Sequence, residues 1–455
     1  MTTIAGPAST PAPDVDRGFL RRLTFACAWG EGLDGFDLGL LSVVLPLITT
    51  ALHMTPVEAG LIGASSLIGI FVGAPLAGYL TDRFGRRLIF SIDLIAFVIL
   101  GLLQALVADP WQLLVVRILL GVAIGAEYSI GAAMLAEFTP SRGRGRRLSA
   151  LLVCWYTGYL VAVVVAFIMT EAGHLSWRWV LAVSVVPAVV TALVRIGFPE
   201  SPRWLIGHGR EPEGRAIVDR YLGGSASYDQ EQFGGESSGK SGYAQLFTPE
   251  NRGRVLFLCV FWACNVAPYF AIFTFAPTVL KSLDLSNETA GTIVLNAMAA
   301  VGAVVGMITI ERIGRRAQAV PPFWIMAAVL AVVGFWAGAP GWIIVACFAI
   351  FSFFNALSGN LTAVYPIETL PTAIRSSGVG FAAAASRVGA AAGTFLLPIG
   401  IAALGIGPCM LIAAAVCVVG ALMSQFRAPE TTNRDLVDTS TSPLRMGGAE
   451  TARRR

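Results

Sequence analysis

The sequence of 455 residues has few charged residues and few of the side chains on which soluble enzymes rely. Only 13% of the residues are Asp, Glu, Lys or Arg, and none of the three histidines, His53, His174 and His208, falls inside a long apolar stretch. The seven cysteines lie in apolar segments without metal-ligand spacing, so we interpret them as small buried side chains. The sequence has no Gly-x-x-x-x-Gly-Lys-Ser/Thr element and no nucleophile–base arrangement, which argues against an ATPase and against an enzyme.

Apolar residues are abundant instead. They make up 55% of the chain, and the mean hydropathy is +0.71, unlike that of a soluble globular protein. A helix that crosses a bilayer needs about 20 mostly apolar residues. Twelve stretches meet this requirement: 23–48, 59–80, 88–108, 111–137, 148–169, 177–198, 255–280, 290–310, 319–337, 342–364, 376–401 and 405–426. We therefore predict an all-α, multi-pass protein of the cell membrane. We expect no cleavable signal peptide, because the first stretch is long enough to remain as a span.

The positions of the arginines predict the orientation. They crowd residues 17–22, 83–87, 142–147, 203–220, 252–254, 312–316 and the segment from 427 onward. Cationic loops stay on the cytoplasmic side, so both termini are expected there. The formal net charge of +4 then reflects topology, and we expect no nucleic-acid partner.

A charged signature occurs twice, about 230 residues apart. Residues Asp82–Arg87 recur as Glu311–Arg316, and a glutamate seven residues before an arginine, Glu137 before Arg144, recurs as Glu368 before Arg375. This repeat indicates a duplicated six-helix bundle. We predict a disordered N-terminus (1–18), a first bundle (19–198), a central cytoplasmic loop (199–254), a second bundle (255–426) and a disordered tail (427–455), with a short amphipathic helix at 210–222.

The repeated charges lie at helix ends on the predicted cytoplasmic side. Ion pairs among them could lock the two halves together and separate during a conformational cycle, or the arginines could serve topology alone. The candidate gate residues are Asp82, Arg83, Gly85, Arg86, Arg87, Glu137, Arg144, Glu200, Arg203, Glu311, Arg312, Gly314, Arg315, Arg316, Glu368 and Arg375.

Four charged residues fall near the middle of predicted spans: Asp34, Asp37, Glu127 and Arg387. Asp34, Glu127 and Arg387 each lie about 15 to 18 Å along the helix from a charged residue at its end, and Asp37 is three residues beyond Asp34 on the same helix face. Charges at this depth are costly, so each is a functional candidate. Because no histidine lies in a span, proton exchange would have to use the carboxylates. The structural alternatives are helix-to-helix hydrogen bonds and permanent pairs, for example of Arg387 with Glu127 or Asp34.

Five motifs occur together in this sequence: Asp82–Arg87, Glu137 with Arg144, Pro199-Glu200-Ser201-Pro202-Arg203-Trp204-Leu205 after the sixth span, Glu311–Arg316, and Glu368 with Arg375. Together they resemble the sugar-porter branch of the major facilitator superfamily over residues 20–430. The resemblance implies two six-helix domains around one central site, with alternating access. Gly35-Phe36-Asp37 is similar to the Gly-Tyr-Asp of proton-coupled sugar porters, whose aspartate carries the proton and pairs with a span-4 arginine. Arg117 occupies the matching position here.

Other matches point to different substrates. The run Asp34-Gly35-Phe36-Asp37 resembles aromatic-acid:proton symporters, in which both aspartates matter, and Glu127-Tyr128 resembles the acidic position in span 4 of phosphate and metabolite symporters. Two further acids, Glu31 and Asp93, are expected nearer a helix end.

The candidate substrate residues depart from the sugar pattern. Span 7 lacks the Gln-Gln-x-Ser-Gly-Ile-Asn run that sugar porters use for hydroxyl groups. Arg387 has a planar fork that suits a carboxylate, and aromatic-acid symporters carry a similar arginine in span 11. The remaining candidates are aromatics and amides, and the aromatics could equally serve packing: Trp155, Tyr156, Asn265, Tyr269, Asn355 and Asn360.

The sequence thus favours a proton-coupled importer of a small organic carboxylate, aromatic acids included. A sugar or polyol symporter, a proton-antiport exporter of a drug or metabolite, and a passive sensor with the same fold stay open. The expected partners are a small-molecule substrate and the lipid bilayer. We expect a monomer without metal or cofactor, with the proton as the coupling ion.

Overall fold

The computed structural model is helical throughout the residues it describes, which are 16–139, 144–223, 243–283, 288–370 and 374–431. Twelve helices in these segments are long and apolar enough to cross a membrane. They match the twelve predicted spans to within a few residues, so the predicted all-α membrane architecture is confirmed.

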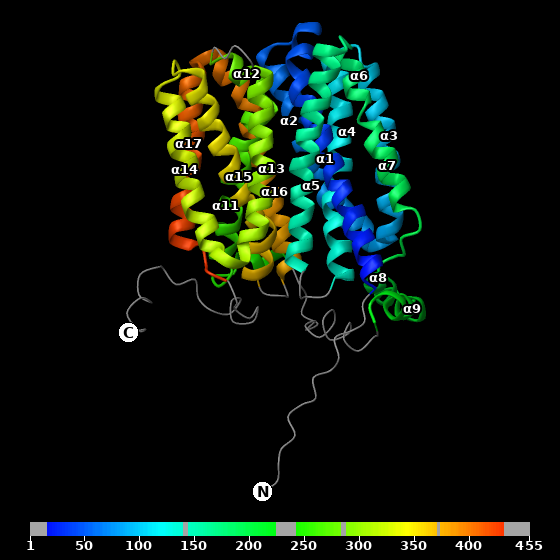
Figure 1. The fold of residues 1–455 in the computed structure, drawn as a ribbon. Coiled ribbons are helices and arrows are strands. Elements are labelled where there is room, and N and C mark those ends of the chain that lie inside the picture. The colour runs from blue at the N-terminus through cyan, green and yellow to red at the C-terminus, as the bar shows by residue number, and fades with distance from the viewer. Residues whose placement is uncertain (1–15, 140–143, 224–242, 284–287, 371–373, 432–455) are drawn as a thin grey trace, which may run out of the picture.

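The N-terminal half contains the first six spans (Figure 1). The fifth span continues α5 through a short π-helical segment, η1, and the sixth is formed by α6 and α7 together. The elements are α1 (Arg17–Ala51), α2 (Pro56–Phe84), α3 (Arg86–Leu106), α4 (Pro110–Phe138), α5 (Arg144–Phe167), η1 (Ile168–Ala172), α6 (Trp177–Ala182) and α7 (Val185–Arg195).

The C-terminal half contains the other six spans, and short elements on the chain between the halves precede it. Of these, α9 confirms the amphipathic helix predicted at 210–222. The connecting elements are α8 (Pro202–Gly207), α9 (Glu211–Tyr221) and η2 (Tyr243–Phe247). The half itself comprises α11 (Arg252–Thr274), α12 (Ala276–Lys281), α13 (Glu288–Ile313), α14 (Arg315–Phe335), α15 (Gly341–Thr369), α16 (Arg375–Leu404) and α17 (Ile406–Arg427).

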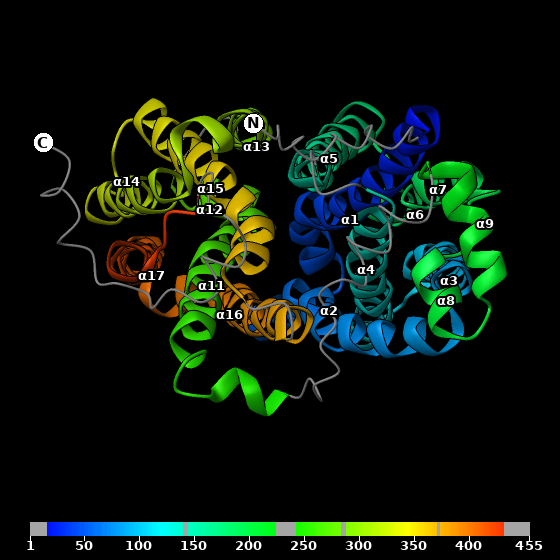
Figure 2. The same ribbon diagram turned by 90° about the horizontal axis from the view of Figure 1, so that it is seen from below.

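The two halves stand side by side, with α2 against α16 and α5 against α13 (Figure 2). Helix α1 begins and α17 ends at the same end of the bundle, the end at which α8 and α9 also lie (Figure 1). We call this the basic end and the opposite one the far end. At the far end Thr289 donates a hydrogen bond to Glu171 across the halves. Nearer the middle, the Tyr159 hydroxyl donates to the carbonyl of Phe273 at 3.2 Å.

Local signals in the sequence set the helix boundaries. Asp16 caps α1 by accepting from the amides of Gly18 and Phe19, at 2.8 and 3.0 Å. Gly85 separates α2 from α3 with φ +94°, and Gly314 separates α13 from α14 with φ +88°. Only glycine adopts this backbone conformation without strain. The repeated Gly-Arg-Arg motif therefore makes the same tight turn at the basic end of each half.

Candidate functional site

The charged motif of the N-terminal half forms a connected network at the basic end. Arg86 at the start of α3 pairs with Glu137 of α4 at 2.5 Å, and the Ser201 hydroxyl donates to the same carboxylate at 2.5 Å. The Glu200 carboxylate accepts from the backbone amides of Arg86 and Arg87, at 2.9 and 3.0 Å. A carboxylate on the first amides of a helix satisfies orphan donors and favours the helix dipole. The network thus ties the segment after the sixth span to α3 and α4.

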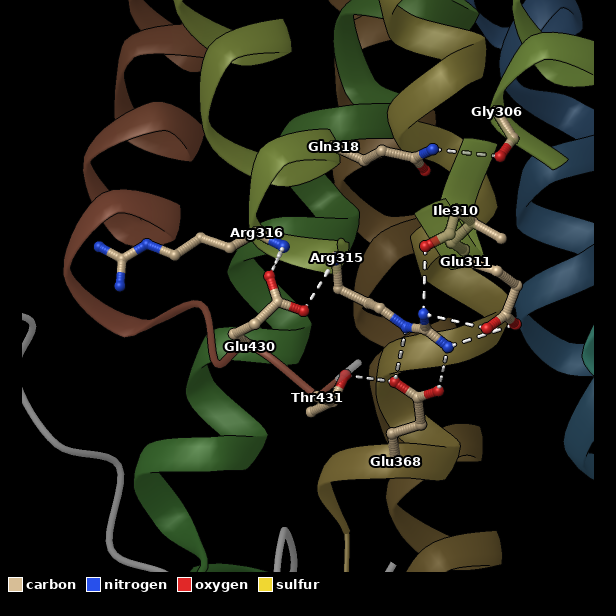
Figure 3. A network of polar contacts seen from close by, with 9 residues as sticks. All are labelled: Gly306, Ile310, Glu311, Arg315, Arg316, Gln318, Glu368, Glu430 and Thr431. Carbon is tan, nitrogen blue, oxygen red and sulfur yellow. Dashed lines mark hydrogen bonds and ion pairs between the residues drawn. The ribbon is translucent and has the colours of Figure 1, made fainter. Parts of the chain in front are cut away.

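The C-terminal half repeats this network with the corresponding residues of its own motif (Figure 3). Arg315 donates to Glu368 at 2.9 Å and also contacts Glu311 at 3.4 Å. The Glu430 carboxylate accepts from the backbone amides of Arg315 and Arg316, both at 3.1 Å, and Thr431 donates to Glu368. Glu430 therefore caps α14 as Glu200 caps α3.

Glu430 belongs to this network, although the polar composition of its segment does not indicate it. The chain after 427 is polar and is predicted to be a disordered tail, yet residues 428–431 pack against α14 and α15, and Tyr365 donates to the Pro429 carbonyl at 3.2 Å. The rest of the predicted tail lies outside the described residues. The signal that could have revealed this cap is the tripeptide Pro429-Glu430-Thr431, which repeats Pro199-Glu200-Ser201.

Two of the predicted gate pairs are described, and each of them lies within one half. Arg86 and Glu137 both belong to the N-terminal half, and Arg315 and Glu368 both belong to the C-terminal half. Of the other candidates, Arg203 lies near Glu137, Arg83 and Arg312 are exposed, and the side chains of Asp82, Arg144 and Arg375 fall outside the described ones.

Deeper in the N-terminal half, Asp37 and Arg117 form the ion pair that the resemblance implies. Arg117 Nη1 lies 2.8 Å from Asp37 Oδ2, and both side chains are 0% exposed. The same nitrogen donates to Gln104 of α3 at 3.2 Å, and Gln104 is itself held by the Leu181 carbonyl. The pair thus connects α1, α3 and α4 far from bulk water.

A second charged cluster lies between this pair and the basic end. Glu127 of α4 is paired with Arg195 at the end of α7 through two hydrogen bonds, of which Nη1 to Oε2 measures 2.8 Å. The Arg195 guanidinium also stacks on the Phe90 ring, 3.4 Å from its centroid. Glu127 is therefore not paired with Arg387, and its partner Arg195 belongs to none of the sequence motifs.

Three further acids face this cluster. Asp34 is 0% exposed, and neither of its carboxylate oxygens has a hydrogen-bond partner among the described residues. Glu31 and Asp93 are both 5% exposed and lie within electrostatic reach of Glu127. As expected, Glu31 and Asp93 lie nearer a helix start at the basic end than Asp34 and Asp37 do, yet both are buried.

Arg387 of α16 lies where the two halves meet. Its guanidinium carbon is 5.0 Å from the ring centre of Tyr128 in the N-terminal half and 5.8 Å from that of Phe270 in the C-terminal half. The side chain is 8% exposed, and Glu31 is the acid on which its charge acts. Within the described part of the chain, no hydrogen bond or ion pair engages this guanidinium.

The predicted aromatic residues form one cluster across the halves. Trp155 and Tyr156 of α5 lie 6.0 and 5.6 Å from the ring of Tyr269 on α11. Phe270, which also contacts Arg387, lies 5.9 Å from Trp155. The Trp155 indole nitrogen and the Tyr269 hydroxyl are buried without a partner among the described residues.

The predicted amides separate into two environments. Asn265 donates to the Ser358 hydroxyl at 2.8 Å, and Asn355 donates to the Asn265 carbonyl at 2.8 Å, so these residues join α11 to α15. Gly359 beside them approaches the Tyr156 hydroxyl. Asn360 instead donates to the Ala303 carbonyl of α13 at 3.2 Å, where it packs two helices together. The described residues contain no group of three metal-binding side chains.

The chain as a whole is similar to known proteins. A family model described as "Sugar (and other) transporter" matches residues 23–441. The chain belongs to this family of the major facilitator superfamily. It is a membrane transporter and not an enzyme.

Individual relatives agree with the family. YaaU of Escherichia coli K12 is 36% identical over 423 residues, 92% of this chain and 94% of YaaU. The inner membrane metabolite transport protein YgcS of the same organism is 36% identical, over 89% of this chain and 90% of YgcS. The niacin transporter NiaP of Acinetobacter baylyi is 26% identical, over 80% and 84% of the two chains. An inward-open structure of the xylose transporter XylE from E. coli superposes with a TM-score of 0.78 at 21% identity, over 92% of this chain and 99% of XylE, and it shares the fold.

Proposed function

We propose that the protein is a proton-coupled transporter that takes up a small organic carboxylate. Arg387 carries this proposal, because its guanidinium lies between the halves without a described acidic partner and against rings from both halves. A guanidinium at this depth is costly unless an anion compensates it. A carboxylate of the substrate would supply two oxygens to the planar fork, and the aromatic cluster would cover its apolar part.

The aromatic side chains near Arg387 favour a ligand with an apolar body, and a few polar atoms among them are available to its polar groups. The Trp155 indole nitrogen, the Tyr269 hydroxyl and the Asn355 amide oxygen lack partners among the described residues, so they can accept or offer hydrogen bonds when the halves move. A relative named for niacin, an aromatic carboxylic acid, is in keeping with this substrate class.

Proton coupling is supported by the buried pair of Asp37 and Arg117. A carboxylate that alternates between a guanidinium and a desolvated position changes its proton affinity, so it can take a proton on one side and release it on the other. If a monoanion enters with one proton, the step is electroneutral, and a pH gradient drives it with about 1.4 kcal/mol per unit.

The proposal is tested in proteoliposomes with an acidic exterior and labelled nicotinate, benzoate and xylose. We expect uptake of a carboxylate, and a ten- to one-hundred-fold rise, roughly, in its half-saturation concentration for Arg387→Ala, as for the loss of a charge-assisted hydrogen bond. Arg387→Lys should recover part of the affinity. Arg215→Ala, on the exposed surface of α9, is the matched control. Xylose uptake that persists in Arg387→Ala, without carboxylate uptake in the wild type, would overturn the proposal.

A sugar is the second candidate. The family description names sugars, and the hydrogen-bonded group of Asn265, Asn355 and Ser358 could serve hydroxyl groups. In that case Asn265→Ala should weaken xylose uptake, whereas Arg387→Ala removes no direct anchor of the sugar.

A further inference from the structure

Asp93 is a buried acid next to the ion pair of Glu127 and Arg195. Glu127 uses both of its oxygens on Arg195, whereas neither oxygen of Asp93 has a hydrogen-bond partner among the described residues. Asp93 is 5% exposed and lies on α3 one turn after Phe90, whose ring centroid is 3.4 Å from the Arg195 guanidinium. Its carboxylate also interacts electrostatically with both Glu127 and Arg195. Two carboxylates thus share one guanidinium.

The charges that face this group do not balance. The acids are Glu31 and Asp34 of α1, Asp93 of α3 and Glu127 of α4. The cations are Arg195 of α7 and, facing Glu31 from α16, Arg387. The other titratable groups near the cluster are Cys27 of α1, Tyr128 of α4 and Cys154 of α5, and all three are neutral in their protonated forms. An excess of buried negative charge is expensive. Protonation of a carboxylate removes its charge and so relieves such an excess.

We propose that Asp93 and Glu127 hold one proton between them beside Arg195, and that they form a second proton-binding centre separate from the Asp37–Arg117 pair. Two neighbouring buried carboxylates that share one guanidinium cannot both ionise at low cost, so one keeps its proton. When Asp93 gives its proton to water, its carboxylate can take one of the Arg195 nitrogens. Arg195 then stabilises whichever acid is ionised.

The centre is built against the helix that carries the other acids. A Cβ atom at Gly30 of α1 would lie 2.0 Å from both Arg195 Nη2 and Glu127 Oε1, so the ion pair rests directly on the backbone of α1. Three acids follow at spacings of one and three residues, Glu31, Asp34 and Asp37, on one face of the same helix. A movement of α1 relative to its neighbouring helices would therefore displace residues of both proton-binding centres.

The expected consequence is a dependence of transport on membrane potential. A monoanion that enters with two protons carries one net positive charge, so its accumulation ratio rises about tenfold for each ~59 mV of inside-negative potential. This consequence rests on the proposed function, since it needs a carboxylate substrate. The proton itself can be detected without any substrate.

The first experiment records infrared spectra of the purified full-length protein at neutral pH and follows the carbonyl band of protonated carboxylic acids. Asp93→Asn should lose one carboxyl from this band, because the amide cannot hold the proton. Arg195→Met should gain one, because both acids then lack a counter-charge. Asp219→Asn, exposed on α9, should leave the band unchanged. A band that is unchanged in Asp93→Asn, or one that does not grow in Arg195→Met, overturns the proposal.

A second variant keeps the test decisive if Asp93→Asn does not fold. In Glu127→Gln the remaining Asp93 carboxylate pairs with Arg195, so the band should again lose one carboxyl; an unchanged band in this variant also overturns the proposal. In proteoliposomes with labelled nicotinate, Asp93→Asn should lose the tenfold response to a ~59 mV potential, and wild-type voltage dependence in this variant would contradict the second centre. If no carboxylate is transported, the proposed function fails while the infrared result still decides the proton site.

Discussion

The pair of Asp37 and Arg117 allows a quantitative prediction of stability. Asp37→Asn leaves the Arg117 guanidinium charged at 0% exposure, with the Gln104 amide oxygen as a remaining hydrogen-bond acceptor. Breaking a buried pair by removing one partner costs about 3 to 5 kcal/mol. For a chain of 455 residues, an unfolding entropy of about 2.1 cal/mol/K per residue converts this into a melting temperature lower by roughly 3 to 5 °C.

The measurement is thermal unfolding of detergent-purified protein, followed by tryptophan fluorescence. Asp37→Asn and Arg117→Met should each melt lower by the amount above. The double variant should melt closer to the wild type than either single variant, because it leaves no unpaired buried charge. Asp219→Asn on the surface of α9 controls for the loss of a carboxylate as such. If both single variants melted with the wild type, the two side chains would not carry opposite charges in the folded protein, and the reasoning would be refuted.

Two further predictions concern close contacts. Gly30→Ala should displace the Glu127–Arg195 pair at a cost of about 1.5 to 3 kcal/mol, as for one charge-assisted hydrogen bond, whereas Gly78→Ala, whose Cβ would meet nothing within 4 Å, should melt at or above the wild-type temperature. Equal melting of the two variants would contradict the packing of the pair on α1. Glu430→Ala removes the cap of α14 at a cost of about 0.5 to 2 kcal/mol, so hydrogen exchange at the amides of Arg315 and Arg316 should become faster; exchange at the wild-type rate would show that the cap does not form.

The spans and the duplication could be predicted because their signals are local. A run of about 20 apolar residues is sufficient to specify a membrane helix, and the glycine with positive φ fixes a turn wherever the Gly-Arg-Arg motif occurs. The pairing of Asp37 with Arg117 was also within reach, through resemblance to a known family. In each case a short stretch of sequence contains the whole signal.

Arg195 and Asp93 could not be predicted in the same way, because their burial is a tertiary property. Arg195 ends α7 and reads as one of many arginines that fix topology, yet α1, α3 and α4 enclose it. Asp93 follows the charged start of α3 by only seven residues, which suggests an exposed position. The partner of Arg195 is Glu127, 68 residues away in sequence, and the residues that surround Asp93 come from other helices. Helix packing, which periodicity does not encode, decides both.

The gate networks are nearly the same in the two halves, but the interior charges are not. The buried acids Glu31, Asp34, Asp37, Asp93 and Glu127 all come from the N-terminal half, whereas Arg387 comes from the C-terminal half. Duplication alone would have placed acids in the interiors of both halves. The interior residues have therefore diverged, whereas the charged networks at the basic end have not. We infer that protons bind in one half and the substrate carboxylate is held from the other. Because Arg387 faces Glu31 across the boundary, a substrate anion that neutralises this guanidinium removes a favourable field from Glu31 and strengthens its hold on a proton. Cargo and proton would then favour each other's binding, which is the thermodynamic requirement for symport.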